Sequence, residues 1–195
     1  LYATDRAALT KALFQGRQTP IDTWVNPYSR LYKKGVKAYP YDPARARQLF
    51  AAAGWRPGSD GLLAKNGQKM VLNFTTTAGN TVRERVQQIL QAQWRQVGVG
   101  VNIQNYPASV VFSTEFSKKA DEGKWDLFMF AWGSDPLLED GNLWASSEIP
   151  TQENGFTGSN YVKYASAAYD AAWRAAQSEF SPAARAQLFD RMQTV

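Results

Sequence analysis

The sequence predicts an α/β fold in which a largely parallel sheet is flanked by helices. From residue 70 onward, strand-like and helix-like segments alternate in the order strand, helix, strand, helix, strand, and this order implies crossover connections between parallel strands. The last strand, predicted over 125–132, contains a continuous apolar run from Leu127 to Trp132. Such a run is typical of a strand that is buried on both faces of a sheet.

Before residue 70, caps and turn residues indicate the elements. Apolar positions spaced as on a helix fill Asp5 to Gln15, and Gly16 closes the pattern. Residues 17–41 have no clear period and predict a long extended connection. Asp42-Pro43 is typical of a helix start, with Asp as the cap and Pro in the first turn. Turn-forming clusters on both sides of Leu62-Leu63-Ala64 predict a hairpin.

The spacing of apolar residues, together with capping residues and glycines, predicts the elements after residue 70. Met70 to Thr76 alternates as a strand does, Asn80 suits the cap of the next helix, and Gly98 stops that helix. The remaining predictions are a strand at 99–103, a helix at 108–122, the strand at 125–132, a loop at 136–164 and helices near 166–178 and 182–194.

We expect residues 1–195 to form a single α/β lobe of a larger protein. The lobe has a helix and extended connection (1–41), an α/β core (42–135), a ligand-side loop (136–164) and C-terminal helices (165–195). The chain starts at Leu1 without an initiator Met, and its last residues fall inside a helical pattern. We interpret it as a piece of a longer protein, so the absence of a signal peptide says little about localisation.

Composition limits the chemistry. The 195 residues are 44% hydrophobic, enough for a packed core, and no apolar run approaches the ~20 residues that span a bilayer. The sequence has no cysteine and no histidine. That excludes disulfides, metal sites built on those ligands and the usual general base near neutral pH. Carboxylate-only metal sites and carboxylate acid/base pairs remain open.

The net charge of +5 is unevenly spread. Residues 1–75 carry twelve Lys and Arg against four Asp and Glu, whereas residues 76–195 carry ten against thirteen. A basic first part suggests nucleic acid as one partner. However, its basic residues are scattered and no nucleic-acid motif accompanies them, so we expect a solvated face and no nucleic-acid partner. Segment 115–153, with nine acids and three bases, would attract cations or amines.

A candidate site follows the predicted strand 125–132. Asp135 lies just past its carboxyl end, where ligands bind in α/β sheets, and Trp132 offers an aromatic wall beside it. Two alternatives stay open. Asp135 before Pro136 also suits a plain turn, and Trp132 equally suits a core position at the end of a strand.

Five sequence motifs, in the same order along almost the whole chain, carry a resemblance. They are Thr4 to Leu9, Tyr41-Asp42-Pro43 through Trp55 with Asp60-Gly61 and Asn66-Gly67, Gly79-Asn80 through Val99, Trp125-Asp126 through Asp135, and Gly158 to Tyr161. Together these motifs resemble those of the extracellular solute-binding proteins of family 5, the dipeptide- and oligopeptide-binding proteins of ABC importers.

The resemblance implies a periplasmic-binding-protein-like C-terminal lobe, domain III of that family, which closes over a peptide together with an N-terminal lobe. It implies delivery to a membrane permease, a periplasmic or lipid-anchored location, and neither catalysis, cofactor nor metal. By the same resemblance, Asp135 binds the amino group of the peptide and Trp132 lines the pocket. Three further ligand-binding candidates are Gly158, Asn160 and Tyr161.

Some alternatives remain. Met129-Phe130-Ala131 stands where some family members carry an Arg that pairs with the ligand carboxylate, so any carboxylate partner must come from elsewhere and ligand length stays open. Carbohydrate or another solute is an alternative ligand. From a different class, Asp135, Glu139 and Asp140 suggest the carboxylates of a glycoside hydrolase, although a solvated acidic loop explains them much better.

Overall fold

The computed structural model describes residues 1–121, 125–133 and 140–195. The chain divides into two compact units. Unit 1 contains Leu1–Pro20 and Tyr39–Ala131, and unit 2 contains Ile21–Ala38 and Trp132–Val195. The assignment of the whole chain to one lobe of a larger protein stays a prediction. No helix within the described ranges is long and apolar enough to cross a membrane.

Unit 1 begins with the two predicted helices, α1 (Arg6–Phe14) and α2 (Pro43–Ala52). The carboxylate of Asp5 accepts a hydrogen bond from the Ala8 amide and caps α1. Asp42 caps α2 in the same way, with Pro43 at its first position. Both caps satisfy helical N–H groups that have no partner within the helix, which is why these helices start where the sequence predicts.

The predicted hairpin is a small antiparallel sheet of three strands. These are β1 (Arg56–Pro57), β2 (Leu63–Lys65) and β3 (Gln68–Lys69), in the order β1-β2-β3. Asn66 and Gly67 join β2 to β3, and both have positive φ, 51° and 79°. An Asn-Gly pair is the preferred sequence for this tight turn because both residues tolerate left-handed backbone.

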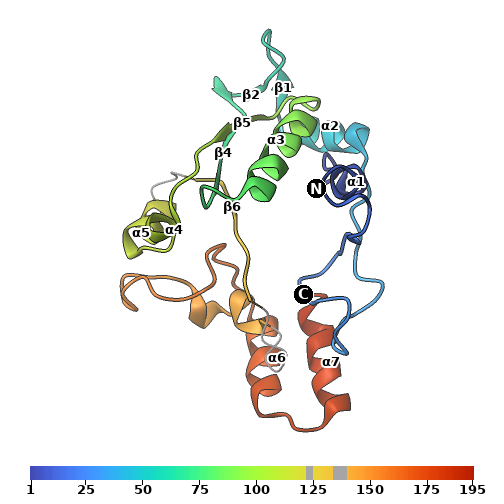
Figure 1. Cartoon of the computed structure of the whole chain (residues 1–195), viewed down its shortest axis with the longest axis vertical. Helices are drawn as coiled ribbons and strands as arrows, with labels where there is room; N and C mark the ends of the chain where they lie inside the picture. The colour runs from blue at the N-terminus through green and yellow to red at the C-terminus, as the bar shows by residue number, and fades with distance from the viewer. Residues whose placement is uncertain (122–124, 134–139) are drawn as a thin grey trace. The chain divides into compact units, whose positions relative to one another are not determined.

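The second sheet of unit 1 confirms the α/β prediction. Its strands β4 (Val71–Thr76), β5 (Gly100–Ile103) and β6 (Leu127–Met129) are all parallel, and β4 lies in the middle. Helix α3 (Thr81–Arg95) connects β4 to β5 and packs on the sheet (Figure 1). The chain therefore leaves β4 to one side for β5 and returns past it to the other side for β6.

The prediction of a strand over 125–132 that is buried on both faces was wrong in length and in burial. The strand is the three-residue β6, and all three of its residues are half-buried. In the described sheet, β6 pairs only with β4 and is an edge strand. The apolar run continues into residues that are not in the strand, and Ala131 and Trp132 are exposed.

The predicted helix over 108–122 is also interrupted. It forms α4 (Ala108–Val111) and α5 (Thr114–Asp121), with a break at Phe112 and Ser113. The Ser113 hydroxyl donates to the Val110 carbonyl at 2.7 Å and accepts from the Phe116 amide at 3.2 Å. Serine competes with helical hydrogen bonding in this way, and so it ends one helix and begins the next.

Two apolar groups stabilise unit 1. The first joins α1, α2 and α3 to the small sheet and includes the buried residues Ala3, Ala46, Leu63, Val97 and Val99. The second lies where α4 and α5 meet β6. There the rings of Phe116 and Phe128 have centroids 5.8 Å apart, and their neighbours are Phe112, Trp125 and Phe130. The apolar run thus packs mainly through aromatic rings.

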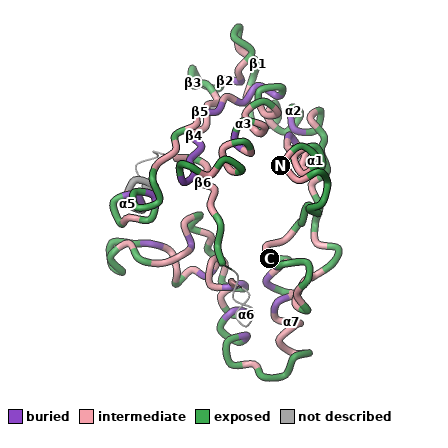
Figure 2. Tube along the Cα trace, in the orientation of Figure 1, coloured by how far each residue is buried: buried purple, intermediate pink, exposed green. Residues whose placement is uncertain are grey.

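Unit 2 has its own core between two helices, α6 (Ala167–Ser178) and α7 (Pro182–Met192). Ser166 and Ser181 cap these helices through their side chains. The loop before α6 contains two short 3₁₀ helices, η1 (Gly141–Trp144) and η2 (Ser146–Glu148). The buried residues of the core are Val25, Ala145, Tyr169, Ala172, Trp173, Ala176, Phe189 and Met192. Figure 2 shows buried positions in purple along α6 and α7.

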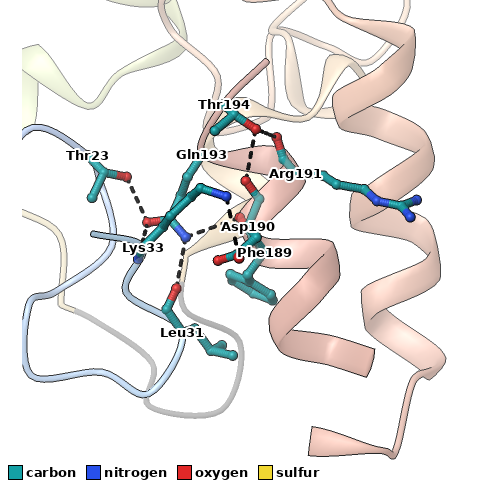
Figure 3. A network of polar contacts seen from close by, with 8 residues as sticks. All are labelled: Thr23, Leu31, Lys33, Phe189, Asp190, Arg191, Gln193 and Thr194. Atoms are coloured by element: carbon teal, nitrogen blue, oxygen red, sulfur yellow. Dashed lines mark hydrogen bonds and ion pairs between the residues drawn. The ribbon is translucent and has the colours of Figure 1, made fainter. Parts of the chain in front are cut away.

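One glutamine attaches the extended connection to unit 2. The Gln193 Oε1 accepts from the Thr23 hydroxyl at 3.0 Å and from the Lys33 amide at 3.1 Å (Figure 3). Its Nε2 donates to the carbonyls of Leu31 at 2.8 Å and Phe189 at 3.1 Å. A salt bridge of 3.4 Å between Lys33 and Asp190 lies beside it. These bonds explain why Ile21–Ala38 belongs with helices more than a hundred residues further along the chain.

Candidate functional site

Asp135, the acidic residue on which the predicted site depends, lies outside the described residues, as does Glu139. Their roles therefore stay predictions. Trp132, at the start of unit 2, is described, and 48% of its surface is exposed. An indole exposed to this extent can be buried further by a ligand, so its position suits a pocket wall better than a core.

Gly158 is required by the backbone of the loop. Its φ is +117°, and a Cβ at this position would lie 2.3 Å from the Glu148 carbonyl oxygen. Every residue other than glycine would both strain this backbone and collide with η2. Gly158 therefore allows the following residues to pack directly against η2.

Asn160 is fully buried, and its side-chain amide is bonded to the backbone on both sides. The Nδ2 donates to the carbonyls of Ala145 at 3.0 Å and Tyr164 at 2.8 Å, while Oδ1 accepts from the Tyr164 amide at 3.1 Å. Asn160 thus joins the end of η1 to the approach of α6. A direct ligand contact by this side chain would require these bonds to be exchanged.

Tyr161 is half-buried next to Asn160. Burial raises the pKa of its phenol above the usual range, so the hydroxyl stays protonated at neutral pH. The structure therefore brings Gly158, Asn160 and Tyr161 together in one loop, in which the first two hold the backbone and the third presents a neutral donor and acceptor. It leaves Asp135 unplaced.

A cavity in unit 2 was missed by the sequence analysis. Its volume is about 210 Å³, and four aromatic side chains line it: Trp24, Trp144, Tyr164 and Tyr169. The Trp144 Nε1 is buried and has no hydrogen-bond partner. Trp24 comes from the extended connection, far from the others in sequence, so no local pattern could have indicated this cavity.

The sequence analysis also missed a polar group at the carboxyl end of β4, which we call the polar edge. It consists of Thr75, Thr76, Thr77, Arg83, Gln87 and Asn105. The three threonines and Gln87 are buried. A run of three threonines at the end of a strand was the available signal, because burying three hydroxyls requires partners for each.

Hydrogen bonds fix most of the polar edge. The Gln87 Nε2 donates to the Phe74 carbonyl at 3.0 Å, and the amides of Gln87 and Asn105 bond reciprocally at 2.9 Å. The Thr76 hydroxyl donates to the Met129 carbonyl at 2.6 Å and so attaches β6 to β4. Arg83 donates through Nη2 to the Thr77 hydroxyl. Two buried atoms have no partner, the Thr75 Oγ1 and the Arg83 Nε.

Within the described ranges, no three acidic side chains cluster closely enough to hold a metal ion. Unit 2 offers aromatic walls and hydrogen-bonding side chains around its cavity, and the polar edge of unit 1 separately offers buried hydroxyls, amides and one arginine. Each set consists of groups that can contact an organic solute.

Comparison with known proteins identifies the family to which the chain belongs. Residues 1–152 match the model of the bacterial extracellular solute-binding proteins, family 5 Middle. The chain is 26% identical over its whole length to the heme-binding protein A of Haemophilus influenzae, covering 32% of that protein. It is also 26% identical to the oligopeptide-binding protein AppA of Bacillus subtilis, over 90% of this chain and 31% of that one.

A solved structure is similar throughout the chain. The oligopeptide-binding protein of Thermus thermophilus, complexed with a pentapeptide, superposes with a TM-score of 0.89 and 39% identity. The match covers 98% of this chain and 34% of that protein. The chain thus spans about a third of the length of the relatives that it matches. Because the family model covers residues 1–152 of 195, the chain belongs to the bacterial extracellular solute-binding proteins of family 5.

Proposed function

We propose that this chain is the C-terminal lobe of the substrate-binding component of an ABC-type peptide importer. In this proposal, the full-length protein captures dipeptides or oligopeptides in a cleft between this lobe and an N-terminal lobe of the same polypeptide. The observation that carries the proposal is the similarity, over 98% of the chain, to a protein solved with a pentapeptide.

The proposed ligand contacts begin with Asp135. Its carboxylate binds the α-ammonium of the peptide once the closed cleft excludes water, because a buried ammonium needs a paired and hydrogen-bonded anion. Trp132, which is 48% exposed, covers the adjacent part of the ligand. The loop from Gly158 to Tyr161 forms part of the cleft, with Tyr161 as its hydrogen-bonding side chain.

The proposed mechanism is binding without catalysis. Ligand stabilises a closed state through contacts that exist only when the two lobes meet. The closed protein then delivers the solute to a membrane permease from the periplasmic or extracytoplasmic side, to which a lipid anchor would hold it. The chain has neither histidine nor cysteine for nucleophilic or general-base chemistry, and nucleic acid has no part in this function.

Native mass spectrometry of the full-length protein tests the proposal. We expect peptides to co-purify with it and to leave it intact. Heme is the informative competitor, because one relative is a heme-binding protein. Co-purification of heme or an oligosaccharide in place of peptides, or release of a cleaved ligand, would contradict the proposal.

A further inference from the structure

The sequence contains two Asn-Gly pairs, and the structure surrounds them with different hydrogen bonds. One is Asn66-Gly67, which joins β2 to β3, and the other is Asn154-Gly155, in the loop between η2 and α6. All four residues are exposed. Asparagine is a chemically labile residue, and a following glycine has no Cβ to keep its backbone nitrogen away from the side-chain amide carbon.

Hydrogen bonds restrain the pair at Asn154. The Oδ1 of Asn154 accepts from the Thr151 amide at 2.9 Å, and its Nδ2 donates to the Ile149 carbonyl at 2.9 Å. The Gly155 amide, which would have to attack the side chain, donates to the Gln152 carbonyl at 3.2 Å. A reaction between these two residues therefore requires three hydrogen bonds to open first.

The pair at Asn66 lacks these restraints. Within the part of the chain that the structure describes, neither the side-chain amide of Asn66 nor the backbone amide of Gly67 has a hydrogen-bond partner. A Cβ added at Gly67 would meet no atom within 4 Å, so the turn is open to water. Both reacting groups are therefore available without the loss of a hydrogen bond.

The strands on both sides of Asn66-Gly67 are short. β3 consists of two exposed residues, and it pairs with β2 through Ala64 with Lys69 and Lys65 with Gln68. A segment with so few pairing and burial contacts opens locally at low cost. The backbone of the turn can therefore rearrange until the Gly67 nitrogen reaches the side chain of Asn66.

We infer that Asn66 is a site of spontaneous deamidation, and that its hydrogen bonds protect Asn154 from the same reaction. The Gly67 nitrogen forms a bond to Cγ of Asn66, the bond from Cγ to Nδ2 breaks, and Nδ2 leaves as ammonia with the proton from the Gly67 amide. The product is a cyclic imide. Water then opens this ring at either carbonyl carbon and gives aspartate or isoaspartate, without an oxidant or reductant. The inference is independent of the proposed function.

The two products should affect the hairpin differently. Aspartate tolerates the positive φ of 51° at this position as asparagine does, and it adds a negative charge beside Lys65. Isoaspartate places an extra atom in the main chain, which a two-residue turn cannot accommodate while β2 and β3 keep their register. Because β2 contributes Leu63 to the first apolar group of unit 1, isoaspartate should also loosen this part of the core.

Peptide mapping by mass spectrometry tests the inference in the full-length protein, incubated at mildly alkaline pH either folded or in concentrated urea. In urea, both Asn-Gly pairs should react at similar rates, because neither keeps its native hydrogen bonds. In the folded protein, Asn66 should react about tenfold faster than Asn154 or more, because three stabilising bonds must first open at Asn154. Isoaspartate among the products identifies the cyclic route, since direct hydrolysis of the amide gives aspartate alone.

The matched variant is Asn66→Gln, whose longer side chain disfavours the small ring. It should abolish the product at this position and leave the rate at Asn154 unchanged. Equal rates at the two asparagines in the folded protein, or a faster reaction at Asn154, would overturn the inference. So would an unreactive Asn66 in the folded protein when the urea-unfolded chain reacts, or a product that contains aspartate alone. The comparison of folded and unfolded wild type remains decisive even if the variant folds poorly.

Discussion

Replacement of Asn160 should destabilise unit 2 far more than replacement of an exposed asparagine. Asn160→Ala removes two bonds from Nδ2, to Ala145 and Tyr164, and one bond from the Tyr164 amide to Oδ1. The three backbone groups left behind are at a fully buried position, so water cannot easily replace the amide. At about 1 kcal/mol for each lost bond, the free energy of unfolding should fall by about 3 kcal/mol.

Asn160→Asp should cost still more. Its carboxylate would face the carbonyl oxygens of Ala145 and Tyr164, which now accept from Nδ2, and it would be a buried charge without a counter-ion. The matched control is Asn154→Ala. Asn154 also bonds the loop backbone through both ends of its amide, to Thr151 and Ile149, but it is exposed, and its loss should cost about 1 kcal/mol or less.

Urea unfolding of the 195-residue chain, followed by tryptophan fluorescence and near-ultraviolet circular dichroism, measures these differences. If the two units unfold in separate transitions, only the transition of unit 2 should move. Equal losses for Asn160→Ala and Asn154→Ala would refute the reasoning, because it depends on burial and not on the number of bonds.

Three further predictions follow from the described residues. Gly158→Ala should cost about 2–4 kcal/mol in the same urea assay, because it combines a positive φ with a collision against the backbone of Glu148; an unchanged midpoint would contradict the fit of this loop. Gln193→Glu should cost about 2 kcal/mol, because its new oxygen would face the carbonyls of Leu31 and Phe189; hydrogen exchange should show faster opening of residues 21–38. Burial raises the pKa of the Tyr161 phenol, so the folded state keeps this proton above pH 10, where the unfolded state loses it. The free energy of unfolding should therefore fall as the pH rises beyond 10, and thermal melts at alkaline pH should show a smaller fall for Tyr161→Phe.

The fold was predictable where local rules decide it. Asp42-Pro43, Asn80 and Ser181 each begin a helix through a side-chain cap, and Asn66-Gly67 forms the expected tight turn. These features depend on contacts within a few residues, which the sequence displays directly. The alternation after residue 70 likewise predicted the parallel sheet, because the crossover connections leave few other arrangements.

The predictions of individual elements were wrong where contacts between residues far apart in the sequence, or side-chain bonds, determine the structure. An apolar run cannot distinguish a strand covered on both faces from an edge strand with an aromatic face, and β6 is the latter. The break at Ser113 depends on a side-chain bond that overrides the helical pattern. Distant contacts also join Ile21–Ala38 to α6 and α7, through the packing of Val25 in their core and through the bonds of Gln193 to Thr23 and Leu31, which span more than 160 residues.

The candidate site was predictable only in part. The resemblance indicated Gly158 and Asn160 as important, but the structure gives both of them clear roles in holding the loop. Arg83 and its polar edge were missed because an arginine in a helical pattern usually indicates a solvated position. Only the three-dimensional structure shows that its Nε is buried without a hydrogen-bond partner.

The most direct test of the account is a calorimetric titration of the full-length protein and its Asp135→Asn variant with free and N-acetylated peptides. We predict that the variant loses about 2–5 kcal/mol of binding free energy for free peptides, the range for removing one partner of a buried charge pair. N-acetylated peptides should bind the wild type weakly and lose little more in the variant. Equal affinity of the wild type for free and acetylated peptides would contradict the claim that this chain anchors the amino end of a peptide.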